Sequence, residues 1–242
     1  MFQFATTCVD NFFKHPDEVI NLADTLDYKP EPKGMWPGAR SPELHLVSPS
    51  FKNAVCTKYL KLHLSAPMIG YQCAAYFQKI GAASGGSGEG WVHNDTPHLH
   101  TTIIYLTPNI SDDSGTSIFI PKPDATAATV AGTNAASAVP SREVFMPVSK
   151  TEGFLKKEQF YKSQINLEEA ETYRLKNNSP FKEVIRFANI YNRCIGFDGS
   201  HWHSSGKFDN VDKEEERLTL IIFWRTIIGP QTGLQRTKMS PI

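Results

Sequence analysis

The stretch Trp91-Val92-His93-Asn94-Asp95 places a histidine and an aspartate two residues apart, directly after a segment rich in glycine and serine. Residues two apart in an extended chain point to the same side, so the imidazole of His93 and the carboxylate of Asp95 can reach a single ion. Imidazole and carboxylate together suit a ferrous ion and leave several coordination positions open. Because a lone His-x-Asp pattern arises often by chance, it indicates a metal centre only if a third ligand exists elsewhere in the chain.

A third ligand is available more than a hundred residues further along the chain. The apolar run 194–197 leads into the turn Asp198-Gly199-Ser200 and then into His201-Trp202-His203. Both histidines would face one side of an extended segment, so either can complete the site. Two imidazoles and one carboxylate occupy one face of Fe(II) and leave the opposite face open. These residues therefore predict a mononuclear site of His93, Asp95 and one histidine of this second pair.

Two further histidines, His98 and His100, lie on a segment that reads as a strand. Alternation places them on the face opposite to Thr101 and Tyr105. We expect them to be packed, solvated or in contact with a substrate. Their spacing also fits a zinc site formed with His93.

Outward from these histidines, the sequence reads as short strands separated by turns. The expected strands cover residues 71–80, 100–106, 116–120, 184–197 and 218–224. The spacing of apolar residues predicts helices over about 16–26 and 50–62, and residues 151–178 are charged and helix-prone. This pattern favours a mainly β fold, a double-stranded β-helix (jelly-roll, cupin-like) core flanked by N-terminal and inserted α-helices.

The length of 242 residues exceeds the usual size of one domain only slightly, which favours a single domain over 1–242. Within it we expect a helical and loop region at 1–65, a jelly-roll core at 66–229 and a loop and helical insertion at about 122–183. Residues 124–140 consist mostly of small residues without a helical period, and they predict a surface loop.

The charge balance and the cysteines limit the class of protein. Lysine plus arginine and aspartate plus glutamate number 25 each, and the resulting zero net charge argues against nucleic acid as a partner. The four cysteines lack C-x-x-C spacing, so we expect reduced, buried thiols. The chain shows neither a secretory signal pattern nor an apolar run long enough for a bilayer, and we expect a soluble, cytoplasmic protein without membrane contact. Its oligomeric state is not indicated.

Arg217 begins the most apolar of the expected strands. A charged residue at the inner end of such a strand needs a partner, because an unpaired buried charge is very costly. A ligand with a carboxylate would serve, since the guanidinium matches it at two points. Thr219 would point to the same side, and Tyr105 could add a phenol from a neighbouring strand. Alternatively, Arg217 closes the charged run 212–216 as one more solvated loop residue.

Taken together, these residues resemble the iron(II)- and 2-oxoglutarate-dependent oxygenases, in particular the prolyl 4-hydroxylase-like branch and its phage and bacterial members. The resemblance spans about residues 70–226. Its matching positions are His93 and Asp95, Tyr105-Leu106, Gly115-Thr116, Phe197 to His203, and Arg217, together with Gly38-Ala39-Arg40 near the front. The chain departs from the family in the long gaps between Asp95 and His203 and between His203 and Arg217.

The resemblance implies a ligand set and a reaction. The offset from Phe197 assigns the third ligand to His203 rather than His201, and the ligand set is then His93, Asp95 and His203. Tyr105, Arg217 and Thr219 would bind the distal carboxylate of 2-oxoglutarate. The implied cofactor is Fe(II), with 2-oxoglutarate and O2 as co-substrates. The carboxylate of Asp95 implies hydroxylation, with release of succinate and CO2, because halogenating members have a small residue at that position.

The sequence does not identify the primary substrate. A peptidyl proline, a free amino acid and another small metabolite all remain open, and the role of Arg40 is not defined. Two other classes are compatible with the same residues. One is a cupin-type metal-binding enzyme or sensor that does not use 2-oxoglutarate, and the other is a non-catalytic jelly-roll binding or structural protein.

Overall fold

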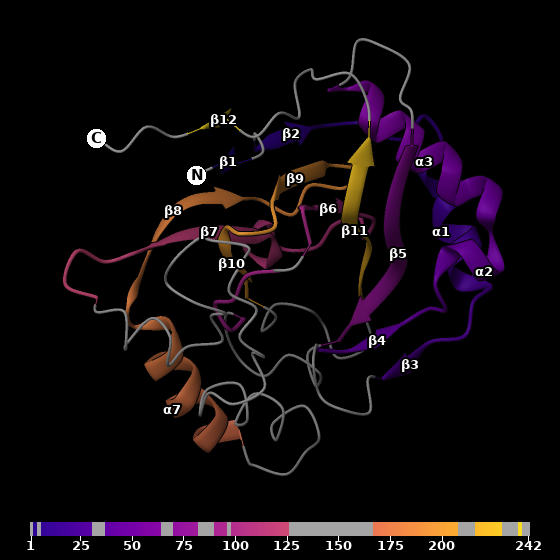
Figure 1. Cartoon of the computed structure of the whole chain (residues 1–242). Coiled ribbons are helices and arrows are strands. Elements are labelled where there is room, and N and C mark those ends of the chain that lie inside the picture. Colours follow the sequence, from indigo (N-terminus) through magenta and orange to yellow (C-terminus); the bar gives the residue numbers. More distant parts are fainter. Residues whose placement is uncertain are drawn as a thin grey trace.

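The computed structural model describes residues 2–3, 6–30, 37–63, 70–81, 90–95, 98–125, 167–207, 216–228 and 237–238. Two antiparallel sheets dominate this part of the chain, one of seven strands and one of three. Figure 1 shows the helices α1, α2 and α3 against one face of the large sheet and the small sheet toward the other. The expectation of a mainly β, jelly-roll-like fold flanked by helices is confirmed.

The large sheet has the strand order β2 (Thr7–Val9), β9 (Cys194–Asp198), β6 (His100–Tyr105), β11 (Arg217–Ile228), β5 (Gly70–Ile80), β4 (Ala39–Arg40) and β3 (Lys29–Pro30). The small sheet has the order β10 (Trp202–Ser205), β7 (Thr116–Pro121) and β8 (Phe181–Phe187). The short strands β1 (Phe2–Gln3) and β12 (Thr237–Lys238) pair with each other. The helices are α1 (Pro16–Asp24), α2 (Leu44–Val47), α3 (Pro49–Lys61) and α7 (Leu167–Asn178), with one 3₁₀ turn at Asp112–Ser114.

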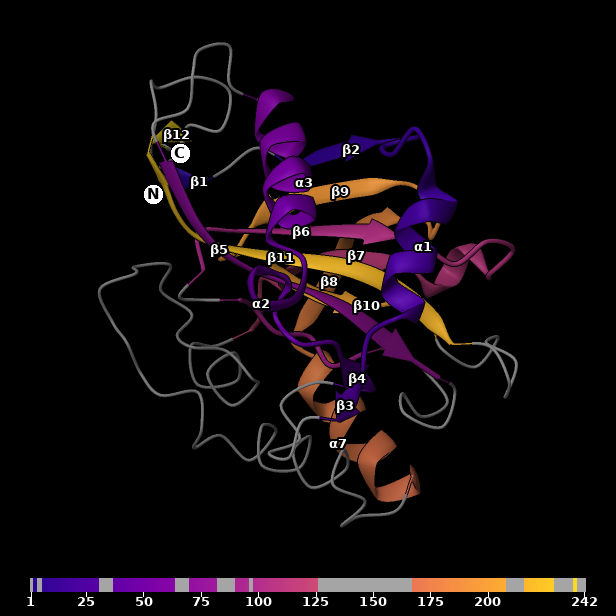
Figure 2. The same ribbon diagram turned by 90° about the vertical axis from the view of Figure 1, so that its right-hand side faces the viewer.

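The helices α1 and α3 form where the sequence predicts them, and together with the unpredicted α2 they cover the outer face of the large sheet (Figure 2). Proline at the first helical position has a favourable φ and loses no helical hydrogen bond, which suits the starts of both α1 and α3. The aromatic ring of Tyr59 in α3 stacks on Trp224 of β11, with ring centres 5.7 Å apart. Both side chains are fully buried in the core between helices and sheet.

A second, smaller core lies on the inner face, between the two sheets. Because successive strand residues alternate in direction, Ile103 and Tyr105 of β6 face inward while Thr102 and Ile104 face the helices. The inward residues of both sheets that pack together are Ile103, Tyr105, Ile118, Phe187, Ile195, Phe197 and Ile221. This inner face is the part of the fold that positions the candidate site.

The expectation of one strand over 184–197 is wrong. The chain forms two strands there, β8 in the small sheet and β9 in the large sheet, and turns between them. A segment that crosses from one sheet to the other cannot remain a single strand. Asn192 adopts a positive φ of 63° in the turn, and its side chain bonds the backbone N and O of Phe13, each at 2.8 Å.

Other expectations have mixed outcomes. All four cysteines are free, but Cys8 is exposed because it lies on the edge strand β2. No helix in the described ranges is long and apolar enough to cross a membrane. The loop expected over 124–140 lies almost entirely outside the described residues, as do residues 151–166 of the helix-prone segment. Its last part, from Leu167 onward, forms α7.

Candidate metal centre

His93, Asp95 and His203 meet at the end of the inner face. One ligand atom from each side chain lies within 4.8 Å of the other two. The Nε2 atoms of His93 and His203 lie 3.8 and 3.4 Å from the Asp95 carboxylate oxygens. The two histidines are joined through their backbones, with N–O distances of 2.9 and 2.7 Å. This bridge lets residues that are far apart in sequence present their imidazoles side by side, with ring centres 4.3 Å apart.

Both imidazoles are oriented by backbone carbonyls. Nδ1 of His93 lies 2.8 Å from the carbonyl oxygen of Trp91, and Nδ1 of His203 lies 3.0 Å from that of His201. A carbonyl oxygen only accepts hydrogen bonds, so Nδ1 carries the proton in each neutral ring and Nε2 keeps its lone pair. In metal sites, a histidine that binds the ion through one ring nitrogen commonly donates its other N–H to such an acceptor, which orients the ring. Both lone pairs are therefore directed toward the carboxylate of Asp95.

Asp95 is held as a carboxylate. Its side chain is largely buried, and Oδ2 accepts a hydrogen bond of 2.5 Å from the hydroxyl of Thr101 on β6. Burial by itself raises the pKa of Asp95, but the charges that His203 and His93 carry when protonated, together with the Thr101 hydrogen bond, outweigh it, and the net pKa is lowered. The ionised form is the one that binds a cation. Sequence reasoning missed Thr101 as a contributor, although its inward alternation on β6 was a usable signal.

Two asparagines at the end of α7 hold the segment that leads into His93. Asn178 accepts from the backbone N of Val92 at 2.9 Å and donates to the carbonyl of Gly90 at 3.0 Å. Asn177 donates to the carbonyl of Val92 at 3.1 Å. The side-chain amides replace backbone partners that this irregular segment lacks, which fixes its path. No sequence pattern pointed to these two residues.

The remaining histidines lie outside the cluster. Among the described residues, one group of three or more potential metal ligands has its ligand atoms within 4.8 Å of one another, and it consists of His93, Asp95 and His203. His201 supplies its carbonyl oxygen to His203, and burial lowers the pKa of its own imidazole. His100 points toward the helices, where its Nε2 lies 2.5 Å from the hydroxyl of Tyr59. Its packing agrees with the structural role expected for it, and the zinc site of His93, His98 and His100 is not formed.

Arg217, Tyr105 and Thr219 lie together on the inner face and are all buried, with exposed fractions of 3%, 0% and 1%. Thr219 is directly opposite Tyr105 in the β11–β6 pairing. The guanidinium carbon of Arg217 lies 5.5 Å from the centre of the Tyr105 ring. Burial lowers the pKa of Arg217, although Tyr105 opposes this effect. The alternative of a solvated loop arginine is wrong, because the side chain enters the space between the sheets.

The metal cluster and this arginine lie toward opposite ends of β6. Thr101, which bonds Asp95, and Tyr105 are four residues apart on the same face. At about 3.3 Å per strand residue, their backbones are roughly 13 Å apart.

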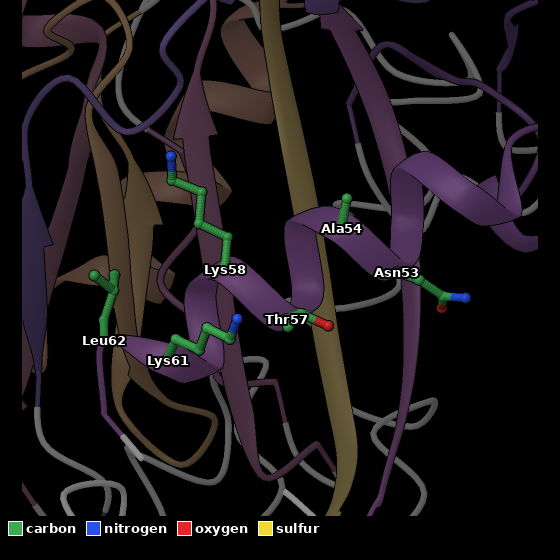
Figure 3. Close-up of a pocket in the computed structure, with 6 residues that line it drawn as sticks. All are labelled: Asn53, Ala54, Thr57, Lys58, Lys61 and Leu62. Atoms are coloured by element: carbon green, nitrogen blue, oxygen red, sulfur yellow. The ribbon is translucent and has the colours of Figure 1, made fainter. Parts of the chain in front are cut away.

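A hollow of about 590 Å³ lies elsewhere, along α3. Figure 3 shows that its side chains spread along the helix rather than converge on one point; they are Asn53, Ala54, Thr57, Lys58, Lys61 and Leu62. Because α3 covers the outer face of the large sheet, this hollow is separated from the cluster by the sheet and its core. We therefore place the candidate site on the inner face.

Comparison with known proteins identifies similar folds only. No family model matches the chain, and no curated protein matches it. Its solved structural neighbours include members of the 2-oxoglutarate-Fe(II) oxygenase family and prolyl 4-hydroxylases, at low identity. An oxidoreductase of that family from Burkholderia pseudomallei is 11% identical, with 90% of this chain and 83% of that chain covered and a TM-score of 0.45.

Two further structures show a likeness of the same order. HygX from Streptomyces hygroscopicus, solved with nickel and 2-oxoglutarate bound, is 11% identical, with coverages of 91% and 82% and a TM-score of 0.47. A prolyl-4-hydroxylase from Pseudomonas putida is 10% identical, with 92% of each chain covered and a TM-score of 0.41. At these identities the likeness extends to the fold alone.

Proposed function

We propose that this protein is an Fe(II)- and 2-oxoglutarate-dependent dioxygenase that hydroxylates a small molecule or a peptide. The observation that carries the proposal is one buried inner face with two distinct ends. At one end, His93, Asp95 and His203 bring their ligand atoms within 4.8 Å of one another. At the other end, Arg217 is buried beside Tyr105.

The donor set fits a ferrous ion. His93 and His203 would each bind it through Nε2, and Asp95 through a carboxylate oxygen. Two imidazoles and one carboxylate satisfy one face of Fe(II) and leave the other for a chelating co-substrate and oxygen. Structural zinc sites, in contrast, favour four protein ligands. The exposed fraction of the His93 side chain is 30% against 6% for His203, which leaves the His93 side open to approach.

The residues at the far end fit the second carboxylate of 2-oxoglutarate. Arg217 would bind it at two points, which suits a planar guanidinium. Tyr105 and Thr219 lie on the same face; the hydroxyl of Thr219 can donate a further hydrogen bond, and that of Tyr105 can do so by exchanging its present acceptor, Thr116, for the carboxylate. Tyr105 itself donates to Thr116 at 2.8 Å, which fixes the phenol in place. A diacid bound in this way would place its distal carboxylate against the buried guanidinium of Arg217.

When bound, Fe(II) and 2-oxoglutarate supply an oxidant for a substrate C–H bond, and succinate and CO2 are released. The chain itself contributes orientation and exclusion of water. Thr101 holds Asp95 ionised and in place, and the carbonyls of Trp91 and His201 hold the imidazoles. The apolar inner core around Ile103 and Phe197 keeps bulk water from the space between the sheets.

The test is an anaerobic titration of the Fe(II)-loaded protein with 2-oxoglutarate. Chelation of the 2-oxo acid by Fe(II) should produce a charge-transfer band in the visible spectrum. His203→Ala should abolish the band, whereas His201→Ala should retain it, because the backbone carbonyl of His201 remains available to His203. A protein that binds Fe(II) without the band would be a cupin-type metal protein, and the proposal would then be wrong. Succinate release with O2 completes the assay.

A further inference from the structure

A group of cationic and aromatic residues adjoins the metal cluster on the inner face. We call it the Arg40 patch, and its members are Arg40, Tyr76, His98, Phe223 and Arg225. The guanidinium carbon of Arg40 lies 5.2 Å from the ring centre of Phe223 and 5.6 Å from that of Tyr76. Phe223 also contacts His98, and the centres of these two rings are 5.0 Å apart. None of these residues was used in the proposed binding of iron or 2-oxoglutarate.

Strand pairing places Arg40 on the same face as the co-substrate residues. Arg40 of β4 is opposite Gln78 of β5, Gln78 is opposite Thr219 of β11, and Thr219 is opposite Tyr105 of β6. Residues directly opposite each other in antiparallel strands share a face. Gly38, with φ of 69°, allows the chain to approach β5 just before Arg40, since a Cβ there would lie 2.0 Å from the carbonyl oxygen of Lys79.

The patch is connected to the metal cluster by pairing as well. Phe223 is directly opposite Thr101, whose hydroxyl bonds Asp95. The backbone N of His98 bonds the carbonyl of Asp95 at 2.7 Å. Two successive ring contacts, from His98 to Phe223 and from Phe223 to Arg40, then lead away from the cluster. A molecule in contact with the patch would therefore lie next to Asp95 of the metal cluster.

The patch contains two cationic side chains, Arg40 and Arg225. The Nε of Arg40 donates to Oε1 of Gln78 at 3.3 Å, which together with the two rings sets the plane of the guanidinium. Arg225 is the extra residue of a β-bulge between Trp224 and Thr226, and its side chain is exposed. Bulges redirect a side chain and are frequent beside active sites. Burial lowers the pKa of His98, and the charges of Arg225 and Arg40 lower it as well, in opposition to Asp95.

Besides Asp95, the acidic residue Glu43 lies close to this group. Glu43 approaches Tyr76, and its carboxylate is 2.8 Å from Nδ1 of His45. Glu43 therefore has a partner outside the patch in His45, and Arg40 is the charged group held against Phe223 and Tyr76. A guanidinium with a fixed plane beside aromatic rings is suited to bind a carboxylate or a phosphate at two points.

We propose that the Arg40 patch binds an anionic group of the primary substrate, a carboxylate or a phosphate, and that the enzyme therefore selects small anionic molecules. Phe223 and Tyr76 would contact the apolar part of the substrate next to that group. This inference rests on the proposed function, because it assumes that the metal and 2-oxoglutarate occupy the neighbouring site. It narrows the substrate from any peptide or metabolite to one with a negative charge near the carbon that reacts.

The test uses the full-length protein with Mn²⁺ in place of Fe(II) and saturating 2-oxoglutarate. The probes are benzoate, phenyl phosphate and the neutral benzamide, and their proton NMR lines are followed. A probe bound beside Mn²⁺ is broadened, and Zn²⁺ in place of Mn²⁺ gives the diamagnetic control. We expect broadening with benzoate, phenyl phosphate or both, and not with benzamide. Benzoate alone assigns a carboxylate, and phenyl phosphate alone assigns a phosphate.

Substitutions of Arg40 test whether the anionic probe binds at the Arg40 patch. Arg40→Met should weaken binding of the anionic probe about tenfold or more, the effect of losing hydrogen bonds to a charged group. Arg40→Lys should weaken it less, since the charge remains and the two-point geometry is lost. Arg186→Met replaces an exposed arginine of β8 in the small sheet and should change nothing.

The possible failures are distinct. If the Mn²⁺-loaded protein does not broaden the proton NMR lines of 2-oxoglutarate, the proposed function itself is wrong. If they are broadened but no anionic probe is, only the substrate inference is wrong. Equal binding of benzamide, or full binding by Arg40→Met, would also overturn it.

Discussion

Replacement of the buried His100 by glutamine should make the stability of this protein less sensitive to acid. His100 is fully buried on the helix side of β6, with its Nε2 2.5 Å from the hydroxyl of Tyr59. Burial, with smaller effects from the charges of His63 and His201, lowers the pKa of His100 from 6.5 to about 3. Glutamine has a similar size and can still bond the hydroxyl, but it does not titrate.

Proton linkage gives the direction and the size of the expected change in the free energy of unfolding. Between pH 6.5 and 3 the unfolded chain takes up a proton at His100 that the folded protein does not, so the folded state loses stability as the pH falls. At pH 5, about 1.5 units below the unfolded pKa, this loss is about 2 kcal/mol. The cost of His100→Gln, measured as a change in the free energy of unfolding, should therefore be about 2 kcal/mol smaller at pH 5 than at pH 7.5.

The assay is urea unfolding of the metal-free wild-type and variant proteins at both pH values. Contributions from other histidines cancel in the comparison of the two proteins. Tyr59→Phe serves as the control, because it removes the hydrogen bond but leaves His100 buried, and it should keep the pH dependence of the wild type. A cost of His100→Gln that is the same at both pH values would show that the neutral, buried histidine does not limit acid stability.

Three other changes have definite expected results. Gly196→Ala should destabilise the protein strongly in thermal unfolding, since a Cβ there would lie 1.9 Å from the Tyr59 hydroxyl; an unchanged melting temperature would contradict this packing. Thr101→Val should weaken metal binding about 10- to 100-fold in a chelator competition, because Asp95 loses its orienting hydrogen bond, and Thr101→Ser should restore it. Arg217→Met should raise the Kd of 2-oxoglutarate about tenfold or more in the anaerobic titration, because the distal carboxylate loses its charged partner, while Fe(II) affinity stays unchanged. Full 2-oxoglutarate affinity in that variant would refute the role proposed for Arg217.

Much of the fold could be predicted from the sequence, because local patterns carry it. Alternating and β-branched residues indicated β5, β6 and β7 close to their observed bounds, and they indicated β11 without its last four residues. Proline and acidic residues at the start of α1 predicted that helix. The break between β8 and β9 escaped prediction, because the segment is apolar on both sides of Asn192 and only its tertiary position requires a turn.

The candidate site was predictable in part. The His-x-Asp pattern and the second histidine pair stood out by residue type and spacing. The residues alone left His201 and His203 as equal alternatives, and the structure separates them: His203 bridges to His93 through its backbone, whereas His201 supplies only a carbonyl oxygen to the other ring. Asn177 and Asn178 carried no sequence signal, and Thr101 carried only its inward alternation on β6, because the role of each residue depends on what it contacts.

The amino-acid sequence by itself determined the periodicity of each element and the types of ligand the chain could offer, since both depend on neighbours within a few residues. Only the tertiary structure decided which of those ligands meet and what lies beside them. The pairing of β11 with β5, and of β5 with β4, brings Arg40 and Arg217 onto one face, and the bridge from His93 to His203 closes a gap of more than a hundred residues. These are long-range registers, set by the packing of two sheets around a common core, and no local pattern encodes them.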